Sequence, residues 1–437
     1  MKIPARLDVA PDAVRHFTAD MTEVIGRVNV AEDPYLPWER FRFHTPPAGL
    51  TPQQWWEVTV VLRQLQWRAL PLLDGAGRPF HYALPDEVLR LVSEVAVKAG
   101  GNIGMPEPVT DAATRDTYIV RSLMEESITS SQLEGAATTR RVAKQMLRSG
   151  RQPRDKSERM IWNNYQAMTF MVAHRAAPLT PEFVLELHAI LTDRTLDDPA
   201  DGGRLQTPAE QRVHVGTFDG EVLHEPPPAE ELPERLSRLC AFANSTEESG
   251  PWLHPILRAL TVHFMVGHDH FFVDGNGRLA RALFYWSMLH QGLWLTEFIT
   301  ISTILKNAPT QYAHSYLNSE YQSDLTYFYV HHLHVLNRAF DDLEEYLARK
   351  IQQRQEVTSL IQRRHADFNH RQLAIIDRAL GDATAEFTVV SHARSHAVTP
   401  ETARQDLLSL TDSGILERFR RGHAYVWRAA PDARAHL

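Results

Sequence analysis

Helical patterns dominate the chain between about residue 111 and residue 361. Apolar residues recur there at the spacing of three and four residues that marks one face of a helix, and strand signals are nearly absent. The pattern therefore predicts a mainly α-helical domain. The expected helices cover residues 115–128, 138–147, 156–173, 181–192, 228–243, 255–268 and 276–289.

One pair of strands is expected inside this helical region. Residues 212–216 and 221–224 alternate between apolar and polar side chains on either side of Asp219-Gly220, a dipeptide that favours a tight hairpin turn. Three prolines at 226–228 end the hairpin stiffly. A lone hairpin is marginal by itself, so two interpretations remain open: a surface loop, or a flap beside a functional site.

The length of 437 residues exceeds what one ordinary core needs, so two or three domains are expected. Residues 1–105 are predicted to form an accessory region with helices of its own. One begins at Thr51-Pro52, where a hydroxyl cap precedes a proline, and another begins at Pro85. Residues 106–362 are predicted to form the main helical domain.

The last part of the chain, residues 365–437, changes character. The expected order is helix, short helix, helix and β-hairpin, which is the order of a winged helix-turn-helix. Arg418, Arg420 and Arg421 on the wing can contact phosphates, yet this region holds nine arginines and nine acidic residues. DNA binding and a protein-contact or dimerisation role both remain open. The predicted helices are 371–380, 388–395 and 399–411, and the strands are 415–419 and 423–427.

Composition excludes several classes of protein. The formal charge of −8 argues against a protein whose whole surface binds nucleic acid. Cys240 is the single cysteine, so no disulfide can form within the chain; a reducing cytosol is the natural setting, and a buried side chain is expected. No secretory signal and no apolar run of about 18 residues is present, so we expect a soluble cytoplasmic protein without a membrane contact.

The segment HFFVDGNGRLAR, residues 270–281, carries the strongest chemical signal. It lies between two predicted helices, and its glycines allow the backbone to approach a ligand closely. The N–H groups that open the second helix form an anion site. Arg278 and Arg281 share one helix face and can both bind phosphate oxygens. Asp274 would repel phosphate unless a cation such as Mg²⁺ bridges them, and His270 is a candidate general base.

Each of these features also has an ordinary structural explanation. A single histidine at a helix end is more often structural, a Gly-Asn-Gly turn is a tight turn, and two arginines on a helix are usually solvated. His263, His268 and His270 suggest a metal cluster, but no cysteine and no clear carboxylate spacing supports zinc. Twelve contiguous residues that together supply a base, a metal carboxylate, an anion site and two phosphate ligands favour phosphoryl-group chemistry.

The same twelve residues resemble the signature of the Fic family, histidine-x-phenylalanine-x-acid-GNGR-x-x-R, at every defining position. Phe271 stands where the family commonly has proline. The resemblance implies a Fic-type helical bundle with a β-hairpin flap, ATP as a substrate, Mg²⁺ as a cofactor, and transfer of AMP to a Ser, Thr or Tyr hydroxyl of a protein, including this chain itself.

The resemblance also implies roles for individual residues. His270 deprotonates the target hydroxyl, Asp274 holds Mg²⁺, and Phe272 anchors the loop in the core. The predicted hairpin takes the place of the family's flap, which aligns the target by strand addition. The implied anion hole is Gly275, Asn276 and Gly277; the phosphate ligands are Arg278 and Arg281; the adenine pocket includes Tyr312; and the flap includes Val213, His214 and Val215.

A second resemblance lies far away in the sequence. Residues 130–135, SSQLEG, are similar to the family's inhibitory motif, and a helix cap is their ordinary explanation. The resemblance implies an inhibitory helix near residues 128–136. The motif within it begins at Ser130. Glu134 would pair with Arg281 and keep it from the γ-phosphate. The position of the motif resembles the class of the family in which the inhibitory helix precedes the core in the same chain. In this chain a predicted winged helix follows the core.

Several alternatives stay open. Within the same fold, Glu134 can orient water and support removal of AMP from a modified target, and another nucleotide or transferred group is possible. An alternative of another class is a DNA-binding regulator that keeps the core as a nucleotide sensor. The expected partners are ATP, a protein with a hydroxyl side chain, possible DNA through the C-terminal region, and a possible second copy of the chain.

Overall fold

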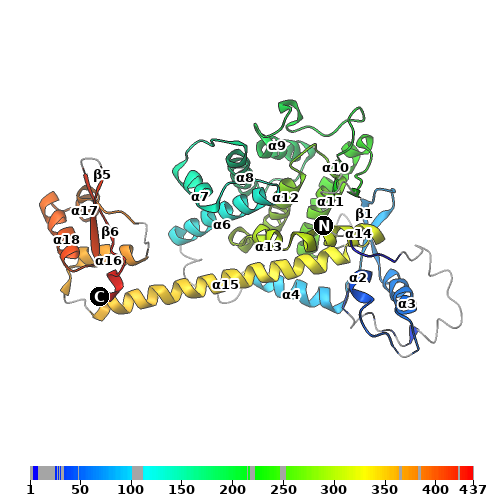
Figure 1. The fold of residues 1–437 in the computed structure, drawn as a ribbon, viewed down its shortest axis with the longest axis horizontal. Helices are drawn as coiled ribbons and strands as arrows, with labels where there is room; N and C mark the ends of the chain where they lie inside the picture. The colour runs from blue at the N-terminus through cyan, green and yellow to red at the C-terminus, as the bar shows by residue number, and fades with distance from the viewer. Residues whose placement is uncertain are drawn as a thin grey trace. The chain divides into compact units, whose positions relative to one another are not determined.

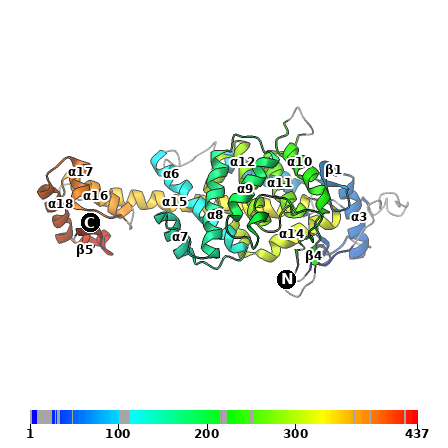
Figure 2. The ribbon, with the colours of Figure 1, turned by 90° about the horizontal axis from the view of Figure 1, so that it is seen from above.

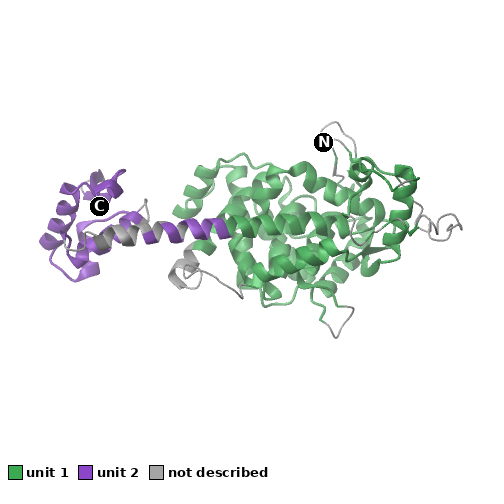
Figure 3. Cartoon of the chain, turned by 90° about the horizontal axis from the view of Figure 1, so that it is seen from below, with its two compact units in different colours: residues 1–343 green, residues 344–437 purple. Residues whose placement is uncertain are grey.

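The structure is a computed structural model. It describes residues 3–7, 25–26, 28, 30, 34–47, 49–100, 112–213, 215–216, 222–246, 252–363, 367–381, 385–421 and 424–436. The chain divides into two compact units, Met1–Leu343 and Glu344–Leu437, which Figure 3 shows in green and purple. Both units consist mainly of helices in their described residues, as the sequence predicts. No described helix is both long and apolar enough to cross a membrane.

The described residues among the first hundred form helices and a hairpin. Thr51 Oγ1 caps its helix by accepting a hydrogen bond from the Gln54 N–H, and Gln54 Oε1 accepts one from the Thr51 N–H. The predicted helix start is therefore confirmed. The hairpin was not predicted, although Asp74-Gly75 lies between its strands. The elements are α2 (Trp38–Phe41), α3 (Pro52–Gln64), β1 (Arg68–Leu73), β2 (Pro79–Tyr82) and α4 (Asp86–Gly100), with β1 and β2 antiparallel.

The rest of the first unit follows the predicted series of helices, and α8 and α9 have the predicted bounds. The elements are α6 (Ala112–Leu133), α7 (Arg140–Ser149), α8 (Lys156–Ala173), α9 (Pro181–Thr192), η2 (Pro199–Asp201), β3 (Val215–Gly216), β4 (Val222–His224), η3 (Ala229–Glu231), α10 (Leu232–Ala243), α11 (Pro255–Asp269), α12 (Asn276–His290), η4 (Trp294–Phe298), α13 (Ile301–Asn307) and α14 (Pro309–Gln322). Helix α15 (Thr326–Arg363) contributes residues to both units.

The predicted bounds of three elements in this region are wrong. Helix α6 continues five residues beyond the predicted end at Ile128, because its C-terminal part is buried against other helices. Its hydroxyl side chains find partners there, such as the Glu125 carbonyl, to which Thr129 Oγ1 donates over 2.8 Å. Strands β3 and β4 are shorter than predicted, and the turn at Asp219-Gly220 lies outside the described residues.

Helices α11 and α12 form the centre of the first unit. They lie side by side in Figures 1 and 2, and both are buried on nearly every face, including polar residues such as Arg258 and Arg281. Helix α12 also contacts α6, α8 and α9, while α11 contacts α10. A helix that is buried all round holds its side chains rigidly. The turn that joins α11 to α12 is residues 270–275, so the fold places the predicted motif at the core.

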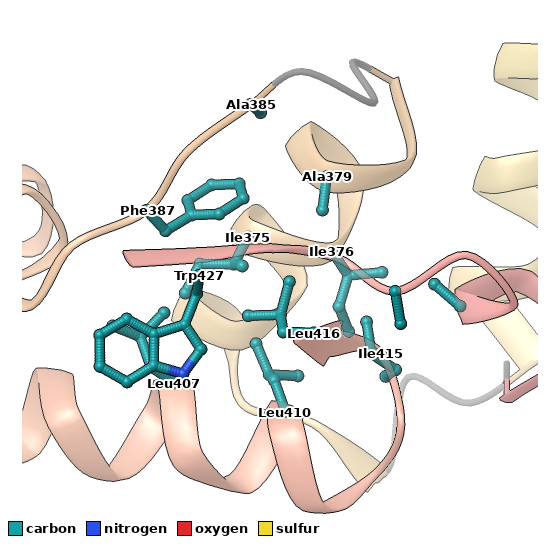
Figure 4. Close-up of a cluster of buried hydrophobic side chains, with 12 residues drawn as sticks. Ile375, Ile376, Ala379, Ala385, Phe387, Leu407, Leu410, Ile415, Leu416 and Trp427 are labelled. Atoms are coloured by element: carbon teal, nitrogen blue, oxygen red, sulfur yellow. The ribbon is translucent and has the colours of Figure 1, made fainter. Parts of the chain in front are cut away.

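The second unit contains the predicted order of three helices and a hairpin. The elements are α16 (His370–Gly381), α17 (Val389–His396), α18 (Pro400–Asp412), β5 (Leu416–Arg421), β6 (Ala424–Ala429) and η6 (Ala433–His436). Strands β5 and β6 pair antiparallel, with Phe419 opposite Val426. Figure 4 shows Trp427 and Phe387 packed with Leu407, Leu410 and Ile415 in a core of its own.

Candidate active site

His270 follows the last residue of α11 in an unusual backbone conformation. Its φ of +48° and ψ of 57° are left-handed, which costs a residue with a side chain about 1–3 kcal/mol. The turn is held from outside by Arg212, whose Nη2 donates to the carbonyls of Asp269 (2.8 Å) and His270 (3.1 Å). The Arg212 Nε donates to the Pro227 carbonyl over 2.8 Å. The base of the hairpin therefore fixes the orientation of His270.

Asn276 closes the loop that follows. Its Oδ1 accepts the Phe272 N–H over 3.0 Å, and its Nδ2 donates to the Phe272 carbonyl over 2.7 Å. Phe272 itself is fully buried. The Asn276 side chain is therefore used inside the loop, and only its backbone N–H can face a bound anion. The first N–H groups of α12 have no partner within the helix.

His188 contacts this loop, although the sequence analysis did not single it out. Its Nδ1 accepts the Gly203 N–H over 3.0 Å, so its Nε2 carries the proton and donates to the Asp274 carbonyl over 2.8 Å. The ring stacks on Phe272 with 3.7 Å between ring centroids. Burial lowers the pKa of His188 to about 4. Its position on the inner face of α9 could be read from the sequence, but its partner on the loop could not.

Arg278 is fully buried and only partly paired. Its Nη1 donates to the Leu191 carbonyl over 3.0 Å, and its Nη2 lies 3.6 Å from Asp274 Oδ2. Within the described part of the chain, its Nε and Nη2 have no hydrogen-bond partner. Leaving buried charged donors without hydrogen bonds is costly. The arrangement therefore indicates a place for an anion beside α12.

An anion of the protein itself already lies next to that place. Glu134 Oε1 accepts a hydrogen bond from Arg281 Nη2 over 2.7 Å, so the expected ion pair is present. A methyl group added to Gly277 would clash with the same Oε1. The Glu134 carboxylate is thus seated against the first turn of α12, where the helix dipole favours negative charge.

Ser130 holds Arg281 in this pose. The Arg281 Nε donates to Ser130 Oγ over 2.8 Å, and its Nη2 donates to the Ser130 carbonyl over 3.1 Å. Ser130 lies one helical turn before Glu134, in the last turns of α6. The two residues of the predicted inhibitory motif therefore bind the same guanidinium, which is 2% exposed.

The protonation of His270 suits a base. Burial lowers its pKa to about 4, and the neighbouring charges of His224 and Arg212 lower it further than Glu134 raises it. The ring is therefore neutral at pH 7 and offers a lone pair for a proton. Asp274 lies at the open side of the loop with its side chain 49% exposed. Its Oδ1 accepts the Gly275 N–H over 2.6 Å.

The remaining predicted residues lie around this centre. Tyr312 on α14 is half-buried, with its hydroxyl 2.9 Å from His263 Nε2. Val213 precedes β3 and is half-buried, Val215 begins β3, and His214 lies outside the described residues. Cys240 is buried on α10, and burial raises the pKa of its thiol to about 12.

Comparison with known proteins agrees with this geometry. Residues 178–288 match the model of the Fic/DOC family. Over 114 residues, the chain is 32% identical to the proteins called protein adenylyltransferase Fic in Drosophila virilis and Drosophila melanogaster. The match covers 26% of this chain and 21% and 20% of those proteins, so the chain spans about a fifth of the length of these curated relatives.

A solved structure shares the fold. A Fic family protein from Desulfovibrio desulfuricans G20 matches with a TM-score of 0.52 and 20% sequence identity, over 80% of this chain and 98% of that one. At this identity the likeness shows the fold alone. The range matched by the family model contains His188, the β3–β4 hairpin and the whole segment from His270 to Arg281. Residues 178–288 therefore form a domain of the Fic/DOC family.

Proposed function

We propose that this chain transfers AMP from ATP to a Ser, Thr or Tyr hydroxyl of a protein, and that Glu134 restrains the reaction. The observation that carries the proposal is the contact of the Glu134 carboxylate with Arg281 and Gly277. It marks an anion position at the start of α12, beside a second buried guanidinium and next to a neutral His270. The names of the curated relatives are consistent with this reaction.

The chain's own residues account for each part of the displacement. The β- and γ-phosphates of ATP bind Arg278, Arg281 and the free N–H groups of α12. The target hydroxyl oxygen attacks the α-phosphorus, His270 accepts its proton, and the bond to the pyrophosphate oxygen breaks. Positioning and charge stabilisation supply most of the catalysis in such reactions. The β3–β4 hairpin holds the target segment by pairing with it as a strand.

A magnesium ion fits at Asp274. Mg²⁺ usually takes one or two carboxylates together with phosphate oxygens and water. The Asp274 carboxylate is half exposed at the start of α12, where those phosphates would lie, and the bond from His188 to its backbone keeps it in place. Asp274 would hold the ion, which when bound would neutralise charge on the phosphates.

The test is labelling with ATP that carries the label on the α-phosphate. We expect Glu134→Gly protein to label itself or added target at least about tenfold more than wild type. Without Glu134, Arg281 is a buried charge without its partner, a state that costs several kcal/mol, and this favours the binding of phosphate in place of the carboxylate. The Glu134→Gly, His270→Ala double variant should stay unlabelled. Glu134→Gln, which keeps the volume and removes the charge, should label to an intermediate extent.

Two outcomes would contradict the proposal. Equal labelling of the single and double variants would remove His270 from its role as the base. Label that arrives only from the γ-phosphate would indicate a kinase. Release of AMP from a premodified target by wild type, without any forward labelling, would instead favour the reverse reaction at the same site.

A second function, DNA binding, is favoured by the β5–β6 hairpin of the second unit, which carries an arginine beside an aromatic ring on both of its faces. Arg418 lies over the ring of Tyr425, 4.5 Å from its centroid, and Arg428 lies over Phe419 at 5.6 Å. Tyr425 is 49% exposed and Phe419 is 44% exposed. Cations next to exposed aromatic rings suit both phosphates and bases. We propose that the β5–β6 wing contacts DNA.

A further inference from the structure

Three buried side chains from three elements meet behind His270. His224 ends β4, His268 lies in the last turn of α11, and Glu320 lies on α14. His224 Nδ1 is 2.9 Å from Glu320 Oε2, and His268 Nδ1 is 3.1 Å from Glu320 Oε1. The side chains are 8%, 5% and 14% exposed, in the order His224, His268, Glu320. We call these three residues the flap clasp.

The hydrogen-bond pattern determines what lies between His224 and Glu320. His224 Nε2 is 2.7 Å from the His268 carbonyl, which can only accept, so Nε2 carries a proton. The other nitrogen, Nδ1, is 2.9 Å from a carboxylate oxygen. Two lone pairs repel at that distance. Either a proton or a metal ion must therefore lie between them. A proton there makes His224 an imidazolium, because the pKa of Glu320 is lowered to about 2 and its side chain is a carboxylate.

His268 distinguishes these two possibilities. Its Nε2 is buried and, among the described residues, has no partner. If Nδ1 bound a metal ion, Nε2 would have to be an unpaired buried N–H donor, which is costly. If Nδ1–H donates to Glu320, Nε2 keeps only a lone pair. The charges agree, because the two histidines bring the pKa of Glu320 down to about 2 although burial raises it.

We propose that His224 is positively charged in the folded protein and, through Glu320, acts as a positioning residue that locks the flap strand β4 beside His270. The same charge disfavours protonation of His270, so the clasp adds to the effect of burial in keeping the base neutral. The other charged groups around the clasp are Arg212 from the hairpin base, Arg235 from α10 and Asp269 from α11, and Glu134 acts on His270. The catalytic part of this inference rests on the proposed function; the charge of His224 does not.

The charge can be measured without any reaction. In the full chain with ¹³C-labelled histidine ring carbons, a pH titration followed by NMR gives the midpoint of each histidine, and His224→Gln assigns the His224 signal. We expect a His224 midpoint above the ordinary value of about 6.5. Glu320→Gln should move this midpoint below that value, raise the His270 midpoint, and speed amide exchange in β4.

A matched control exists on the same helix. His314 on α14 pairs with Glu39 over 3.1 Å, the distance found between His268 and Glu320. Glu39→Gln should leave the His224 midpoint and β4 exchange unchanged. A wild-type His224 midpoint at or below 6.5 would overturn the proposal. So would one equivalent of a transition metal in the purified protein that is lost in Glu320→Gln, because a metal ion would then occupy the place of the proton.

The catalytic consequence is tested in the Glu134→Gly background. Adding Glu320→Gln should raise the KM for the protein target at least about fivefold and shift the acid limb of the pH–rate profile upward, with ATP affinity unchanged. A general loss of folding would lower ATP affinity as well and contradict a positioning role. If no variant labels any target but the titrations behave as expected, the flap clasp stands and the proposed function fails.

Discussion

At the residue scale, His188 makes a prediction about pH. Its pKa of about 4 in the folded protein lies below the ordinary value of about 6.5, so the unfolded chain binds the proton more readily between these values. The contribution of His188 to the free energy of unfolding is fully present above pH 6.5. It falls by about 3 kcal/mol as the pH falls through 4. Urea unfolding at several pH values should show that His188→Gln is less stable at pH 7 by about 1–3 kcal/mol, with a weaker loss in acid.

The exposed His174 provides the comparison for this experiment. His174→Gln should retain the stability and the acid sensitivity of wild type. If His188→Gln kept the full acid-induced loss, that loss would belong to other buried histidines, such as His263 and His332.

Single residues also show where sequence reasoning stops. His270, Asp274 and Arg281 were identified because the motif is contiguous and each residue type has a known chemistry. His188 was missed because its partners, Gly203 and the Asp274 carbonyl, are 15 and 86 residues away in the chain. The same applies to Glu320, which lies 96 residues from His224. Patterns within a helix predict burial, but they do not predict which distant group a buried side chain contacts.

At the scale of elements, α6 carries Ser130, which bonds to the guanidinium of Arg281. Ser130 Oγ accepts from Arg281 Nε, so Ser130→Ala removes one of the bonds that hold the guanidinium while Glu134 stays in place. We expect α-phosphate labelling between that of wild type and that of Glu134→Gly, because one hydrogen bond to a charged group contributes about 1.5–3 kcal/mol.

Ser127 is the matched control on the same helix. Its hydroxyl donates to the Leu123 carbonyl within α6 over 2.6 Å, whereas the Ser130 hydroxyl accepts from Arg281. Ser127→Ala should label no more than wild type. Equal labelling of the two alanine variants would mean that any loosening of α6 activates the protein, and that the Ser130 contact has no special role.

Elements with local start signals were predicted best. Helices α8 and α9 have the predicted bounds because Asp155 and Thr180 cap them by accepting N–H groups three residues ahead. The end of α6 was misplaced because hydroxyl residues at 127, 129, 130 and 131 are weak helix formers, and burial against other helices overrides that preference. The β1–β2 hairpin was missed because Arg235, which donates to the Leu73 and Asp74 carbonyls, comes 162 and 161 residues after them.

At the scale of the whole molecule, the DNA proposal predicts a salt-dependent interaction. Replacing Arg418, Arg420 and Arg421 by alanine in the full chain should abolish retention on immobilised duplex DNA at low salt, since each lost phosphate contact lowers the slope of log affinity against log salt by about 1. A variant that loses Arg90, Arg141 and Arg238, three exposed arginines of the first unit, has the same net charge and should still bind. Equal loss in both variants would indicate attraction by net charge alone.

The contact between Glu134 and Arg281 has a consequence for how the site is emptied and filled. Because the chain supplies its own carboxylate, the guanidinium of Arg281 has a charged partner without any nucleotide. That carboxylate is tethered, so it competes with a free anion at a high local concentration. In the proposed reaction, binding of the terminal phosphate to Arg281 is therefore an exchange of one anion for another.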